Sequence, residues 1–376
     1  MRWTRVFGLL LAGLWLVGGA IVLSSGAGRA EADASPYELV EFELQPPPEN
    51  AEELIRAAMA ESGDAGAATV FPPDDRIRVT DTTQPIFRTV ARLGIFDHNE
   101  NLSYCSGTLV AVNVVLTAAH CVYFSGRYVK SVVVIPGSNG LNWPFGSGYS
   151  IRMAVPNGWA NGPGRDPADA LLPPTIYDWA ILVLDLYDWD DTIMRPYPVI
   201  AYAPDGFLND HSVGLVTAGY PGDKPVGTMW WTAVDHEDFF FDDDFIYTWA
   251  DVYKGQSGSP IWAVSPDTAY IVSVVSGGNS YVNRSVRFSI PVVNALESYA
   301  RELGASLTTY ILPGDTPAPT PTWTPTRAAS PTATPTPTRT TPPTFTPPAT
   351  PTRAATPTPT PPPRPAPIRI PQVARD

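Results

Sequence analysis

The sequence predicts an all-β protein. Between Ile86 and Phe288, short runs rich in β-branched and aromatic residues alternate with turn signals, as in folds built from many short strands. An amphipathic helical pattern follows from Pro291 to Leu303, with Gly304 after its end. This pattern alone fits either barrels or a sandwich. We expect strands at residues 87–96, 103–111, 128–135, 149–155, 179–184, 212–218, 228–234, 245–249, 261–264, 270–275 and 286–289.

Residues 1–32 have the pattern of a secretory signal peptide. Arg2 and Arg5 precede an apolar run from Val6 to Leu23, and small residues follow up to Ala32. Cleavage after Ala32 predicts a secreted, extracellular protein. The run lies at the lower limit for spanning a bilayer, so an uncleaved membrane anchor is the alternative.

Residues 33–68 are acidic and contain prolines, with a short helical pattern at residues 51–59. We expect a propeptide that is removed from a zymogen. The alternative is a spacer that stays attached to the folded protein.

Residues 313–376 form a tail of prolines interleaved with threonines. About half of the 43 prolines of the chain lie in it. Such a segment cannot bury a core, and we expect a disordered, extended polyproline stalk with a short apolar end at residues 367–374. The stalk is a candidate tether to the cell envelope.

The formal net charge is −13, although the tail from residue 316 carries six arginines and one aspartate. The remaining chain is therefore strongly acidic. Such a body repels nucleic acid and favours cationic partners. We expect no nucleic-acid partner and a monomeric protein.

Three segments carry the residue types of nucleophilic catalysis. Ser257 lies in Gly-Gln-Ser-Gly-Ser-Pro, His120 in Leu-Thr-Ala-Ala-His-Cys and Asp178 in Asp-Trp-Ala-Ile-Leu. A serine needs a neighbouring base and a group that fixes the tautomer of that base. An α/β-hydrolase would place its histidine after the serine, whereas the last histidine, His236, comes before Ser257.

On these motifs, the sequence resembles the trypsin-like serine proteases of the chymotrypsin clan, and among them the bacterial glutamyl-endopeptidase branch. Further matches lie at residues 75–83, 219–225 and 286–288. The resemblance spans roughly residues 69 to 304 and places the protease domain at 69–312. It implies two packed six-stranded antiparallel β-barrels, closed by the C-terminal helix.

The resemblance also implies roles for residues around the triad. The N–H groups of Gly255 and Ser257 would form the oxyanion hole. Cys105 and Cys121, the two cysteines of the chain, would form a disulfide, the alternative being two free buried thiols.

The expected substrate pocket comprises Asp251, Val252, Val275 and Gly277. Trypsins place an acid for binding lysine or arginine at the position of Asp251, which favours a basic residue before the cut slightly over a small or apolar one. No histidine occurs at residues 273–278, and Val252 replaces a threonine that is usual in the glutamyl branch, so we doubt a glutamyl preference. Gln256 occupies the position at which trypsins carry the acid of their activation salt bridge. We therefore expect that this protein is not activated through such a salt bridge.

The acidic run at residues 235–244 is a second candidate site. Its carboxylates could hold Ca²⁺, but their spacing is not that of an EF-hand, and such runs are usually solvated. We therefore expect no metal and no cofactor. The predicted function is a secreted serine endopeptidase acting on proteins or peptides, and the alternative is an inactive binding or adhesion module on a stalk.

Overall fold

The computed structural model describes residues 35–58, 69–124, 126–162, 175–185, 195–265 and 268–314. The predicted signal peptide and the predicted stalk beyond Gly314 lie outside these residues. Within the described ranges, no helix is both long and apolar enough to cross a bilayer.

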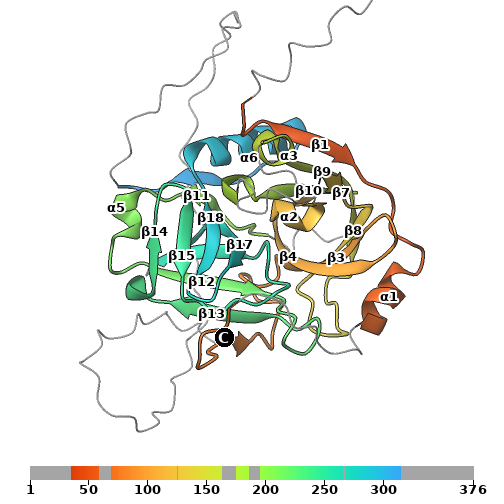
Figure 1. Cartoon of the computed structure of the whole chain (residues 1–376), viewed down its shortest axis with the longest axis horizontal. Helices are drawn as coiled ribbons and strands as arrows, with labels where there is room; N and C mark the ends of the chain where they lie inside the picture. Colours follow the sequence, from red (N-terminus) through yellow and green to blue (C-terminus); the bar gives the residue numbers. More distant parts are fainter. Residues whose placement is uncertain are drawn as a thin grey trace, which may run out of the picture. The chain divides into compact units, whose positions relative to one another are not determined.

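Six antiparallel strands close into a first barrel (Figure 1). The ring closes because β9 pairs with β10 along most of its length and with β8 at its start. Every residue of β3, β5, β8 and β10 is buried. In ring order the strands are β8 (Ser131–Pro136), β3 (Val90–Phe96), β4 (Leu102–Ala111), β5 (Val114–Thr117), β10 (Ala180–Leu184) and β9 (Gly148–Pro156).

A second sheet is also antiparallel along its main path. Among the described residues no pairing joins its two ends, so it curves as a half barrel. Two further strands, β11 (Ile200–Tyr202) and β19 (Thr309–Ile311), pair in parallel beside β17. The path runs through β14 (Phe239–Phe241), β15 (Phe245–Thr248), β18 (Asn283–Arg287), β17 (Thr268–Gly278), β16 (Pro260–Ser265), β12 (Gly214–Gly219), β13 (Trp230–Val234) and β2 (Ile77–Arg78).

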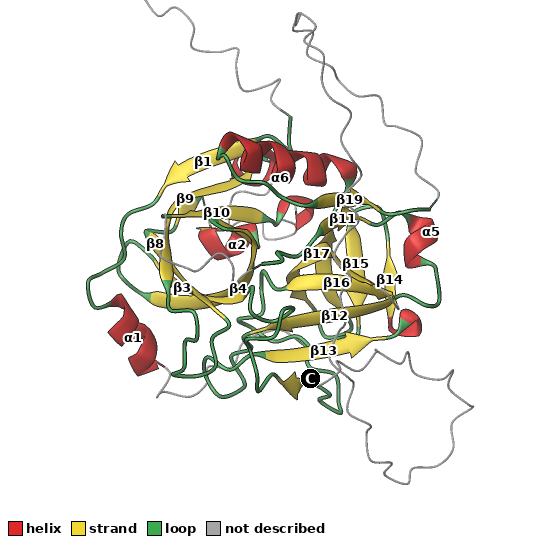
Figure 2. Ribbon diagram, turned by 180° about the vertical axis from the view of Figure 1, so that it is seen from behind, coloured by secondary structure: helices red, strands yellow, loops and turns green. Residues whose placement is uncertain are grey.

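The two sheets share one apolar core. A single cluster of buried side chains includes Trp179 and Ile181 of the first sheet region together with Trp262 and Phe288 of the second. Helix α6 (Ile290–Glu302) lies across one end of both sheets (Figure 2). Its buried residues recur at intervals of three or four, which is the spacing of one helix face: Val292, Val293, Leu296, Tyr299 and Ala300.

Each strand expected from the sequence is present within a few residues, and the all-β fold class is confirmed. The sequence analysis does not predict the strands β1 (Leu39–Glu43), β2, β5, β6 (Tyr123–Phe124), β11, β14 and β19. The remaining short elements are α2 (Ala119–Val122), β7 (Arg127–Tyr128), α3 (Asn157–Ala160), η2 (Thr175–Tyr177), α5 (Asp205–Leu208) and η3 (His236–Asp238).

The folded unit begins well before residue 69. Strand β1 pairs along its whole length with β9, and α1 (Ala51–Ala58) packs its buried Ile55 on the first barrel. A Cβ at Gly94 would lie 2.7 Å from Ile55 Cδ1, so the glycine makes room for this side chain. The segment expected as a propeptide is therefore packed as part of the barrel.

Candidate active site

The register of two paired strands brings His120 and Asp178 together. His120 lies in α2, just after β5, and Asp178 lies just before β10. Thr117 of β5 is paired with Ala180 of β10, so the two side chains emerge at the same edge of the sheet. His120 Nδ1 lies 2.8 Å from Asp178 Oδ2, and the His120 main-chain N–H donates to Asp178 Oδ1 at 2.8 Å.

The Asp178 carboxylate is 2% exposed. Burial raises the pKa of Asp178. The charge of His120 and the hydrogen bonds that the Asp178 carboxylate accepts outweigh this effect, so its pKa lies below the usual value. Burial lowers the pKa of His120, but the charge and hydrogen bond of Asp178 outweigh burial, and the pKa of His120 lies above its usual value. The pair thus combines an ionised carboxylate with an imidazole suited to accept a proton.

Ser276 of β17 is a third member of this network, and the sequence analysis missed it. Its Oγ donates to Asp178 Oδ2 at 2.5 Å. The signal that could have revealed it is a serine between Val275 and Gly277, two residues expected to line the substrate pocket.

Ser257 lies in a tight turn beside His120. Its carbonyl oxygen accepts a hydrogen bond from the Ser106 N–H at 2.9 Å. The sulfur of Cys121 lies 3.8 Å from that oxygen and 3.9 Å from His120 Nε2, so Ser257 and His120 both lie next to the Cys121 sulfur. Among the described residues, the Ser257 hydroxyl makes no hydrogen bond. Catalytic hydrogen bonds are often loose without substrate and tighten when it binds.

The turn needs its two glycines. Gly255 has φ +98° and Gly258 has φ +82°, both in the region that favours glycine. A Cβ at Gly258 would lie 2.2 Å from Thr117 Oγ1. The Gly255 carbonyl accepts a hydrogen bond from Ser106 Oγ at 2.8 Å. The N–H groups of Gly255 and Ser257 donate no hydrogen bond within the described part of the chain and are therefore available to an acceptor.

The expected disulfide between Cys105 and Cys121 is present and joins β4 to α2. It fixes the segment carrying His120 to the barrel. Both sulfurs are consumed by the bond, so the group formed by these cysteines and His120 offers no thiolate for a metal.

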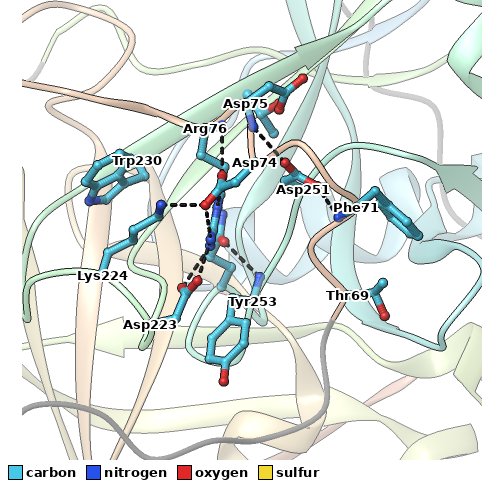
Figure 3. A network of polar contacts seen from close by, with 12 residues as sticks. Thr69, Phe71, Asp74, Asp75, Arg76, Asp223, Lys224, Trp230, Asp251 and Tyr253 are labelled. Carbon is cyan, nitrogen blue, oxygen red and sulfur yellow. Dashed lines mark hydrogen bonds and ion pairs between the residues drawn. The ribbon is translucent and has the colours of Figure 1, made fainter.

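Asp251 is only 2% exposed, and its carboxylate faces the main chain. Oδ1 accepts the Phe71 N–H at 2.6 Å and Oδ2 accepts the Asp75 N–H at 2.9 Å (Figure 3). Burial raises its pKa, and these two hydrogen bonds offset the increase only in part. The carboxylate thus holds the segment that begins at Thr69, rather than standing free for a cationic substrate.

The other expected pocket residues flank this region. Val275 and Gly277 lie on either side of Ser276, and Val252 follows Asp251. Both valines are buried, whereas no atom lies within 4 Å of the place that a Cβ on Gly277 would take.

Gln256 is fully buried inside the turn. Its Oε1 accepts the Tyr253 N–H at 2.9 Å. A neutral amide therefore braces the Ser257 turn from within, at the position where trypsins carry an acid.

An ion-pair cluster around the buried Arg76 side chain ties residues 74–76 to the loop at residues 221–225. Arg76 Nε donates to Asp74 Oδ1 at 3.0 Å, and Arg76 NH1 donates to Asp223 Oδ1 at 2.9 Å (Figure 3). Lys224 Nζ bonds Asp74 Oδ2 at 2.5 Å. Because Gly222 N–H donates to the Lys254 carbonyl at 2.7 Å, this loop also braces the residue before Gly255.

The nucleophile turn borders a pocket of about 370 Å³. Lys254, Gly255 and Tyr220 lie in its wall, together with Tyr104 and Arg92 of the first barrel. The turn is therefore open to a ligand on the side of this pocket.

Comparisons with known proteins agree with this geometry. No family model matches the sequence. The chain is 30% identical over 246 residues to the glutamyl endopeptidase of Bacillus licheniformis, covering 61% of this chain and 69% of that protein. It is 28% identical over 243 residues to the extracellular metalloprotease of Bacillus subtilis, covering 62% and 71%. A solved structure of a Glu endopeptidase in complex with MPD matches with a TM-score of 0.51 and 25% identity, over 62% of this chain and 100% of that one.

The fold, the order of the motifs and the extent of the first match agree. The chain therefore belongs to the trypsin-like serine protease family, in which it resembles the glutamyl-endopeptidase branch, and it is a serine endopeptidase.

Proposed function

We propose that this endopeptidase hydrolyses peptide bonds by acylating Ser257, with His120 as general base and Asp178 as the acid that orients it. One observation carries the proposal. His120 and Asp178 are joined by two hydrogen bonds, and they lie beside a turn in which the N–H groups of Gly255 and Ser257 are available to an acceptor.

The proposed steps follow from these positions. Asp178 keeps the proton of His120 on Nδ1, which leaves the lone pair of Nε2 free to accept the Ser257 proton as Oγ attacks the substrate carbonyl. The imidazolium then protonates the leaving amine. Water repeats the sequence on the acyl-enzyme. The N–H groups of Gly255 and Ser257 would stabilise the oxyanion in both halves.

The competing proposal is an inactive binding or adhesion module that kept the fold. Loss of catalysis removes the need for a pair such as His120 and Asp178. Here Asp178 is buried and accepts three hydrogen bonds, two from His120 and one from Ser276. Burying a carboxylate is costly unless it is paired, so this arrangement favours the enzyme.

For the residue before the cut, we propose a preference for small or apolar side chains. The basic preference rested on Asp251, whose carboxylate is engaged by Phe71 and Asp75. The neighbouring Val252 and Val275 are apolar and buried, and the position of a Cβ on Gly277 is open, so the described residues offer no charged partner to a substrate side chain there. Neither valine could neutralise a glutamate, which leaves the glutamyl preference without support from the pocket.

We propose that the protein is secreted and acts on extracellular proteins or peptides. The predicted signal peptide, the disulfide and the extracellular character named for the Bacillus subtilis relative support this. Tethering through the stalk is a further proposal. Because β1 and α1 pack on the first barrel, we also propose that residues 35–58 stay attached in the secreted protein, and N-terminal sequencing of that protein tests this.

A fluorophosphonate probe tests the nucleophile. The secreted protein should be labelled, and Ser257→Ala should not. Ser280→Ala, a change at an exposed serine three positions after Gly277, should be labelled as the parent is. A folded parent that resists the probe would favour the binding module.

Peptides that differ only in the residue before the cut test the specificity. We expect alanine, valine or leucine to be cleaved fastest. If cleavage is fastest after lysine or arginine, and Asp251→Asn abolishes this preference, the hypothesis of a pocket for basic residues is supported instead. If cleavage is fastest after glutamate, the specificity is that of the glutamyl endopeptidases.

A further inference from the structure

A cluster of metal-ligating side chains lies on the second sheet, away from the triad. It consists of His211, His236 and Glu237, whose ligand atoms all lie within 4.8 Å of one another. His211 follows α5, whereas His236 and Glu237 belong to η3, between β13 and β14. Figure 1 shows α5 beside β14, so the fold brings the two segments together.

Buried neighbours hold both segments in place. Leu208 and Val213, on either side of His211, are buried in the same apolar cluster as Val234 and Phe239, which flank η3. The His236 ring also packs edge-on against Phe239, with centroids 5.4 Å apart. The positions of the two histidines are thus set by the core and not by their own contact.

The contacts within this cluster leave the Nδ1 atom of His236 unsatisfied. His211 Nδ1 lies 3.3 Å from Glu237 Oε1, and His236 Nδ1 lies 3.9 Å from the same oxygen, beyond hydrogen-bond distance. The His236 Nδ1 atom is buried and has no hydrogen-bond partner in the described part of the chain. The two rings are only 4.2 Å apart between centroids, which would be unfavourable if both were charged.

We propose that His211, His236 and Glu237 bind one divalent transition-metal ion, Zn²⁺ by preference, with water completing the coordination. Ligands 2.0–2.2 Å from Zn²⁺ in a tetrahedron stand roughly 3.3–3.6 Å apart. The distance between His211 and Glu237 already meets this spacing. His211 and Glu237 are 78% and 62% exposed, so their side chains are free to turn toward His236. The ion would take one lone pair from each ligand and satisfy the buried Nδ1.

The donor set argues against Ca²⁺, which prefers oxygen ligands. In the calcium site considered at residues 235–244, the Asp242 carboxylate is also engaged by local contacts. Asp242 Oδ1 accepts the N–H groups of Asp244 and Phe245, and its Oδ2 accepts the Tyr247 hydroxyl. Two imidazoles and one carboxylate instead match the ligands of zinc sites that keep a water.

Calorimetric titration of the full chain with zinc chloride tests the proposal. The Ser257→Ala background prevents self-digestion, and prior treatment with a chelator removes bound metal. We expect one zinc ion per chain, and about tenfold or weaker affinity in His211→Ala and in Glu237→Gln. These two side chains are exposed, so both variants should fold. His98→Ala removes a histidine outside the cluster and should bind as the parent does.

A thermal shift provides a second readout. Zinc at a hundredfold excess over its Kd should raise Tm by about 5–10 °C in the parent and in His98→Ala, and not in His211→Ala. The proposal is overturned if zinc does not bind, if Ca²⁺ binds more tightly, or if binding survives His211→Ala and disappears in His120→Ala.

Discussion

Replacing Arg76 by methionine should destabilise the protein far more than its position near the domain surface suggests. The Arg76 side chain is fully buried, and it donates hydrogen bonds to Asp74 and Asp223. Without it, Asp74 keeps Lys224, whereas Asp223 keeps no partner among the described residues. Removing one member of a buried ion pair costs about 3–5 kcal/mol. Because Asp223 retains 26% exposure, we expect the lower end, about 3 kcal/mol.

This loss corresponds to a decrease in Tm of roughly 6–12 °C for a domain of this size. Urea unfolding and thermal unfolding at pH 7, in the Ser257→Ala background, would measure it. Arg78→Met is the matched control, because Arg78 is exposed and its side chain donates to Asn139 without an ion pair among the described residues. It should change the free energy of unfolding by less than about 0.5 kcal/mol.

The effect of Arg76→Met should also depend on pH. The hydrogen bonds of Arg76 hold the pKa of Asp74 well below its usual value. A carboxylate whose pKa is lowered by folding stabilises the protein above its unfolded pKa, near 4, and this contribution is lost as pH falls through the folded value. The difference between parent and variant should therefore be constant from pH 7 to about pH 5 and shrink below pH 4. A loss no larger than that of Arg78→Met, or one independent of pH, would refute the reasoning.

Three further predictions concern catalysis. The kcat/KM for a small peptide should rise with pH, and the midpoint of this rise should lie above pH 6.5, because the pKa of His120 is raised and only its neutral form accepts a proton. Asp178→Asn removes the charge that raises this pKa, so it should move the midpoint to lower pH. Ser276→Ala removes one hydrogen bond to a charged group, about 1.5 kcal/mol, and should lower kcat/KM roughly tenfold without lowering Tm by more than a few degrees. Gly258→Ala should prevent formation of the active turn, because its Cβ would lie 2.2 Å from Thr117 Oγ1. Gly277→Ala should fold normally, because the space at that position is open, and it should alter only the size of side chain accepted before the cut.

The sequence predicts the strands well, because the signals are local, and the proposed triad rests on signals of the same kind. Short β-branched runs mark the strands of both sheets, and each triad residue lies inside a motif of a few neighbours. The contact between His120 and Asp178 also follows from their places beside two adjacent strands.

Contacts between distant segments escaped prediction. Asp251 was assigned to substrate because of its spacing from Ser257, but the N–H groups that engage it belong to residues 180 and 176 positions earlier. Nothing near Asp251 in the sequence signals those donors. Likewise, His211 and His236 meet only because α5 and η3 are anchored on one apolar cluster.

Strand β1 has a practical consequence for anyone producing the isolated protease domain. A protein that starts at Thr69 would leave the β9 edge at residues 152–156 without its partner. It would also expose Phe96, Val133 and Ile135, the surface under Ile55. Unpaired strand edges next to apolar surface promote aggregation. Soluble expression should therefore begin at Ser35, and insolubility of the shorter form would reflect a missing strand instead of a missing folding catalyst.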